Sequence, residues 1–160
     1  MYEMRRKNKE VTDRNWMEDI LKRARFMHLG MAEADGQPYV VPIGYGYGDG
    51  VIYIHGAPEG RKNDILAVNP KVCFQVTLDA EVVPSEVGSQ FTMKFRSVTG
   101  FGTVCSLTDP RERNAALKIL IEHYGGPHAD IPENSDMHKR LWVARLDIEY
   151  MTGKKSVYPS

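Results

Sequence analysis

Two Asp-Gly pairs, each placed beside apolar stretches, constrain the fold of this 160-residue chain more than any other feature. Asp35-Gly36 separates an apolar run at 26–32 from another at 39–43, and Asp49-Gly50 precedes a third at 51–55. Asp-Gly is a preferred sequence of tight two-residue turns, because both turn positions need positive φ angles. The pattern therefore predicts a meander of three antiparallel strands, and not parallel strand–helix–strand units.

Three helices are expected around these strands, over 13–25, 61–68 and 109–123. Thr12 or Asp13 is placed to cap the first helix, whose apolar residues recur at spacing four. The third has a strong start, since Asp109 can cap it and Pro110 suits the first turn.

The remaining apolar stretches predict further strands over 72–78 and 141–151, and the stretch 91–107 is long enough for one bent strand or two. Gly100 and Gly102 would mark a bend or bulge in the long strand. Residues 79–90 are acidic and are expected to form an irregular surface excursion. About six antiparallel strands with three helices indicate a mainly β fold of the α+β kind, closed as a small split barrel.

Charge and composition exclude several classes of protein. The 21 Lys and Arg residues balance 21 Asp and Glu residues, so the basic excess of a nucleic-acid binder is absent. No run of about 18 apolar residues could span a membrane, and no apolar stretch follows the basic N-terminus as in a secretory leader. We expect one cytoplasmic domain over 1–160, and zero net charge weakly favours self-association.

Several reactive side chains in the sequence give no evidence of a disulfide, a metal site or a hydrolase site. Cys73 and Cys105 lie in apolar runs and are expected to be reduced thiols in the core. His128 and His138 match no metal-ligand spacing, so no metal is predicted. Ser97 lacks the Gly-x-Ser-x-Gly context of a hydrolase nucleophile.

Four glycines alternate with other residues at 44, 46, 48 and 50. In a strand they would all lie on one face. Two interpretations stand: the backbone packs closely against another element, or it forms a flat shelf for a planar ligand.

The sequence Gly60-Arg61-Lys62 stands at a predicted helix start. Either the two cations are simply solvated, or they bind an anion. Cations beside the helix dipole are unfavourable unless an anion binds, and a phosphate would also gain from the unpaired N–H groups, which favours an anion site. His55 ends the preceding strand, either as a hydrogen-bonded structural residue or as an acid/base group. These features together favour a planar, phosphorylated ligand, for which flavin mononucleotide (FMN), another nucleotide and pyridoxal phosphate all qualify.

The order of motifs along the chain resembles the nitroimidazole-resistance (Nim) type of the pyridoxamine 5′-phosphate oxidase-like, FMN-binding split-barrel superfamily. The motifs are Met4-Arg5-Arg6-Lys7 with Glu10-Val11-Thr12-Asp13, Pro38-Tyr39-Val40-Val41-Pro42-Ile43-Gly44-Tyr45, Tyr53-Ile54-His55-Gly56-Ala57 with Gly60-Arg61-Lys62, Asn69-Pro70-Lys71-Val72-Cys73-Phe74, Arg96-Ser97-Val98 with Gly100-Phe101-Gly102, and Ile148-Glu149 with Met151-Thr152-Gly153-Lys154. They cover nearly the whole chain, and their combination is specific.

The resemblance implies a six-stranded Greek-key split barrel and a homodimer with FMN at the subunit interface. It implies phosphate contacts near Arg61 and Lys62 with help from the strand at Arg96-Ser97, and a flavin ring near His55, the candidate catalytic residue. The complete set of expected cofactor-binding residues is Pro42, Ile43, Gly44, Tyr45, His55, Gly60, Arg61, Lys62, Arg96, Ser97 and Trp142.

Members of this family type are associated with reducing the nitro group of 5-nitroimidazole drugs to an amine. The resemblance thus implies an FMN-dependent oxidoreductase acting on small nitroaromatic molecules. The chain ends at Ser160 without the extra dimerisation segment of pyridoxamine phosphate oxidases, so vitamin B6 oxidation is not expected. The alternatives are a non-catalytic flavin or haem carrier or sensor on the same fold, and a structural dimerisation module.

Overall fold

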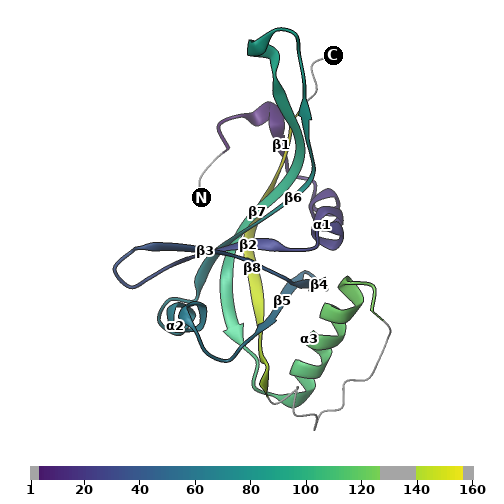
Figure 1. Ribbon diagram of the computed structural model, residues 1–160. Coiled ribbons are helices and arrows are strands. Elements are labelled where there is room, and N and C mark those ends of the chain that lie inside the picture. Colours follow the sequence, from purple (N-terminus) through teal and green to yellow (C-terminus); the bar gives the residue numbers. More distant parts are fainter. Residues whose placement is uncertain (1–3, 127–139, 157–160) are drawn as a thin grey trace.

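The computed structural model describes residues 4–126 and 140–156, and all strands within them belong to one antiparallel sheet (Figure 1). In sheet order the strands are β3 (Pro38–Ile43), β2 (Met27–Ala32), β6 (Lys71–Val83), β7 (Thr92–Ser106), β8 (Trp142–Lys155), β5 (Val51–Gly56) and β4 (Gly46–Gly48), and β1 (Glu10–Val11) pairs with β8. The helices are α1 (Arg14–Arg23), α2 (Arg61–Val68) and α3 (Pro110–His123), with 3-10 turns η1 (Lys7–Lys9) and η2 (Gly88–Gln90). This arrangement confirms the mainly β split-barrel fold.

The prediction of a three-strand meander at the start of the chain is wrong for the third strand. β2 and β3 form the expected hairpin, but β5 pairs with β4 and β8, where Ile52 lies opposite Leu146. β3 runs into β4 through Gly44 and Tyr45 alone, so this link joins the two ends of the sheet. The buried Tyr45 hydroxyl donates a hydrogen bond to the Leu21 carbonyl (2.6 Å), which fixes the link against α1.

Residues 79–90 also differ from the expected irregular excursion. β6 continues to Val83 and β7 begins at Thr92, so the two strands extend as an arm away from the barrel (Figure 1, top). The only irregularity in their pairing is a register shift between Leu78 and Glu81, where Asp79 has a positive φ of 53°. The register shift in this acidic stretch thus bends the β6–β7 pair without ending the strand pairing.

The bulge expected in the long strand is confirmed. The register of β7 against β8 shifts between Phe101 and Gly102. A side chain at Gly102 would collide with the Asp147 carbonyl oxygen, so the close approach of the two backbones requires glycine there.

The helix starts follow the sequence signals closely. The Asp13 carboxylate accepts from the backbone N–H groups of Asn15 and Trp16, and Asp109 accepts in the same way from Arg111 and Glu112. α1 stops at Arg23, two residues earlier than expected. Its apolar stripe, which is Met17, Ile20 and Leu21, is buried in the main core.

The alternating glycines serve close packing, so the interpretation as a shelf for a planar ligand is wrong. α3 covers this face: a Cβ at Gly46 would lie 2.8 Å from the Leu120 Cα, and one at Gly48 would lie 3.2 Å from Ile119. A Cβ at Gly44 would collide with the Tyr124 hydroxyl. The absent side chains thus let a helix backbone approach a strand backbone.

The two thiols are not equivalent. Both are free, but only Cys73 is half-buried, and burial raises the pKa of its thiol. Cys105 is exposed, which corrects its expected place in the core, because its neighbour Val104 on β7 takes the inward position. His128 and His138 lie outside the described residues. Among the described residues no helix is long and apolar enough to cross a membrane, and no three His, Cys, Asp or Glu side chains gather as metal ligands.

Candidate functional site

A cavity of about 350 Å³ lies where β3, the end of β5 and the start of α2 meet. Its lining residues are Tyr39, Val41, Pro42 and Ile43 from β3, His55 from β5, and Ala57, Glu59, Gly60, Arg61, Lys62 and Asn63 from the loop and α2. An apolar wall from the strand thus faces a polar wall from the helix start.

The polar wall is the uncapped N-terminus of α2. Gly60 is the N-cap residue, and its φ of 115° is a conformation that side chains disfavour. It has no side chain to accept from the first N–H groups, and its carbonyl accepts only from Asn63 (2.8 Å) and Asp64 (3.1 Å). The partial positive charge of the helix therefore lies open at the cavity.

Arg61 stands at this N-terminus but already has partners. Its Nε donates to Oε1 of Glu33 (2.8 Å), and its guanidinium carbon lies 4.7 Å from the centroid of the Tyr39 ring. The pair is solvent-exposed, so water and salt weaken it. An anion in the cavity would compete with Glu33 for the guanidinium.

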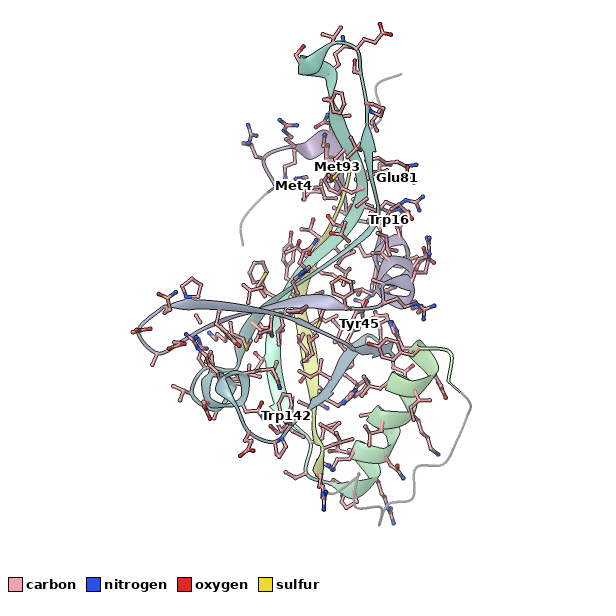
Figure 2. All side chains as sticks on the ribbon, in the orientation of Figure 1. Met4, Trp16, Tyr45, Glu81, Met93 and Trp142 are labelled. Atoms are coloured by element: carbon pink, nitrogen blue, oxygen red, sulfur yellow. The ribbon has the colours of Figure 1, made fainter. Side chains whose placement is uncertain are left out.

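Lys62 is the more enclosed cation. Its Nζ lies 3.8 Å from the centroid of the Trp142 ring and donates to the Asn63 side-chain oxygen (3.0 Å). Figure 2 shows Trp142 near the lower end of the barrel. Burial lowers the pKa of Lys62 to about 8, because the ammonium has lost part of its hydration.

His55 is the titratable residue that β5 contributes to the cavity wall. Burial lowers the pKa of its imidazole, and the charge of Lys62 lowers it further. The ring is therefore neutral at neutral pH and can accept a proton or a hydrogen bond.

The structure brings together six of the eleven cofactor-binding residues expected from the sequence. Those that line the cavity are Pro42, Ile43, His55, Gly60, Arg61 and Lys62. Trp142 is adjacent through its contact with Lys62, and its Nε1 donates to the Ser106 hydroxyl (2.9 Å).

Four expected residues do not line the cavity. Gly44 and Tyr45 lie against Tyr124, whose hydroxyl accepts from the Tyr45 N–H (3.0 Å). Arg96 lies on β7 and pairs with Asp79 (Nε to Oδ2, 3.1 Å), and Ser97 is buried on the same strand.

Sequence reasoning missed the side chains that hold the two cations. Glu33 and Tyr39 flank Arg61, and Asn63 accepts from Lys62 while donating to the Ala57 carbonyl (3.1 Å). Asn63 could have been found as a polar residue in the first helical turn. No local pattern ties Glu33 to Arg61, because the contact depends on how the β2–β3 hairpin packs beside α2.

Comparison with protein families matches residues 13–155 to the pyridoxamine 5′-phosphate oxidase family. The match spans most of the chain, so the chain belongs to this family, and the resemblance drawn from its motifs is confirmed. A search of curated proteins finds no match.

Solved structures support the same placement. A proposed 5-nitroimidazole antibiotic resistance protein from Bacteroides thetaiotaomicron is 28% identical, with 91% of this chain and 86% of that chain covered and a TM-score of 0.81. An FAD and heme binding protein from Mycobacterium smegmatis is 23% identical (coverage 95% and 76%, TM-score 0.84). The flavocytochrome Anf3 from Azotobacter vinelandii is 21% identical (coverage 99% and 74%, TM-score 0.82), and these last two show the shared fold alone.

Proposed function

We propose that the cavity at α2 binds FMN and that the chain is an FMN-dependent reductase of nitroaromatic compounds such as 5-nitroimidazoles. The observation that carries the proposal is the open N-terminus of α2, which presents Gly60, Arg61 and Lys62 to one cavity. Helix N–H groups, a guanidinium and an ammonium are together the usual ligands of a phosphate. The residues present therefore fit the phosphate end of the cofactor.

The other wall suits a flat ring. Pro42 and Ile43 present an apolar strand edge, and His55 presents a neutral imidazole at the same cavity. The neighbour described as an FAD and heme binding protein supports a flavin in this fold, and the one described as a 5-nitroimidazole resistance protein supports a nitroimidazole as substrate. We further propose a homodimer with the flavin site at the subunit interface.

Bound flavin would supply the electrons, and the protein would supply binding, orientation and protons. At neutral pH Lys62 carries a proton, since its pKa is about 8, whereas His55 does not. The Lys62 ammonium therefore serves the phosphate, and His55 is suited to orient the substrate or to relay a proton.

The test is the spectrum and the turnover of the purified protein. A flavin spectrum after reconstitution with FMN, and anaerobic consumption of a nitroimidazole when a chemical reductant is supplied, support the proposal. His55→Gln should keep the flavin spectrum and slow turnover. A colourless protein that FMN cannot reconstitute excludes flavin binding, and an FMN-loaded monomer excludes the shared site.

The second candidate is a haem or flavin carrier without turnover. The neutral imidazole of His55 at the cavity wall favours it, because an unprotonated ring nitrogen is what a haem iron requires. A Soret band on reconstitution with haemin, lost in His55→Gln, would support haem. Flavin binding without turnover of any nitroaromatic compound would support a flavin carrier.

A further inference from the structure

A second cavity, of about 420 Å³, is lined by the N-terminal segment, β7 and β8. Figure 1 shows the N-terminal segment beside β7 on the side of the barrel from which the arm extends, away from α2. The lining residues of the cavity are Met4, Arg5, Arg6, Lys9, Phe95 and Lys154. Four of these six side chains are cationic and none is acidic. A volume of this size is within the usual range of small-molecule sites.

The N-terminal wall of this cavity is held in place by specific contacts. The Lys9 N–H donates to the Arg6 carbonyl (3.0 Å), and β1 then pairs with β8, so that Val11 lies opposite Gly153. A Cβ at Gly153 would lie 2.6 Å from the Trp16 ring, so glycine there lets α1 and β1 pack closely on β8. Figure 2 shows Met4 beside the arm.

The opposite wall combines an aromatic ring with a further cation. Phe95 on β7 is half-buried, and its backbone is fixed by Ser156, whose N–H donates to the Phe95 carbonyl (3.0 Å). The Nζ of Lys154 lies 5.7 Å from the centroid of the Phe95 ring. The ring and the charge therefore face the same volume.

The cations of this cavity have few acidic partners among the described residues. Glu10 lies opposite Lys154 in the strand pairing, but its carboxylate pairs with Lys7 (3.3 Å). Within the described residues no acidic side chain pairs with Arg5, Arg6 or Lys9. Gathering like charges around one volume is unfavourable until an anion enters it, and the zero net charge of the chain conceals this concentration.

We propose that this cavity is a second ligand site, which binds a phosphate-bearing aromatic anion of the nucleotide class. Arg5 and Arg6 can each donate paired N–H groups to phosphate oxygens, and Lys9 and Lys154 add charge. A base can stack on Phe95, because the ring offers its face to any planar group. The site shares no residue with the proposed flavin cavity, so one can fail while the other stands.

The experiment is a calorimetric titration of the FMN-loaded protein with ATP, inorganic triphosphate and adenosine. We expect ATP to bind most tightly, triphosphate more weakly, and adenosine not measurably, with affinities that fall as salt is added. Arg5→Gln/Arg6→Gln should weaken ATP binding by roughly tenfold or more, since charge-assisted contacts are lost. Arg111→Gln, an exposed arginine on α3, is the matched control and should bind ATP like the parent protein.

A second variant separates stacking from charge. Phe95→Leu keeps an apolar side chain on the strand and should weaken ATP binding while leaving triphosphate binding unchanged. Equal ATP affinity in Arg5→Gln/Arg6→Gln and the parent protein would overturn the proposal. So would the absence of ATP binding, or release of flavin into solution as ATP binds, since the cavity would then not be a separate nucleotide site.

Discussion

The guanidinium of Arg61, which lines the cavity at α2, donates to the carboxylate of Glu33, with 2.8 Å between Nε and Oε1. An acid therefore holds the cation that we assign to the cofactor phosphate. The two roles compete, because a phosphate that binds Arg61 must either displace Glu33 from the guanidinium or share the guanidinium with it. The structure thus contains an internal competitor for the proposed ligand.

Glu33→Gln should tighten FMN binding by a few-fold. The change removes the competing carboxylate and its repulsion of the phosphate, and the modest size reflects an exposed ion pair. The measurement is the quenching of FMN fluorescence on titration with protein. Glu18→Gln is the matched control, because it breaks another exposed Arg–Glu pair, that of Arg14 (2.8 Å), away from the cavity. Weaker binding by Glu33→Gln would contradict the assignment of Arg61.

FMN affinity should depend on pH through Lys62. The pKa of this lysine is lowered to about 8 in the free protein, and a bound phosphate would raise it. Above pH about 8 binding must therefore take up a proton, so affinity falls with rising pH, by no more than about tenfold per pH unit. It is flat between about pH 7 and 8, where the phosphate keeps both of its charges.

Lys62→Arg is the control for this pH dependence, because a guanidinium stays charged across the whole range. FMN titrations of both proteins at a series of pH values make the comparison. A decline of equal steepness in Lys62→Arg would mean that another group titrates, and that Lys62 does not hold the phosphate.

The contact between β4 and α3 should be sensitive to one methyl group. A Cβ at Gly46 would lie 2.8 Å from backbone atoms of Leu120, which cannot rotate away. Gly46→Ala should lower the free energy of unfolding by about 1–3 kcal/mol, the usual cost of overpacking. Urea denaturation gives the comparison with Gly88→Ala, where nothing lies within 4 Å and little change is expected. Equal stability of the two variants would refute the packing role of the glycines.

Local signals in the sequence predicted the local parts of this fold. The caps Asp13 and Asp109 and the Asp35-Gly36 turn act within a few residues, and each stands where expected. The pairing of β5 with β8 could not be read in the same way, because Ile52 and Leu146 are distant in sequence and share no local motif. The arm was missed because acidic residues suggested a loop although strand pairing continued through them.

In the candidate site, too, the local features could be predicted from the sequence and the tertiary contacts could not. The helix start at Gly60-Arg61-Lys62 is a local motif whose phosphate chemistry follows from the helix dipole. Glu33 comes to Arg61, and Trp142 to Lys62, only through tertiary packing. The glycine run was ambiguous for the same reason, since its partner α3 comes from a remote stretch of the chain.

The central claim is that α2 holds the phosphate of FMN, and the most direct test compares FMN with riboflavin, which carries the same ring and no phosphate. Fluorescence titrations of both ligands against the same protein isolate the contribution of the phosphate. The account predicts that FMN binds about a hundredfold more tightly, since at least two charge-assisted contacts are added. Riboflavin affinity within a few-fold of FMN, or no binding of either, would contradict it.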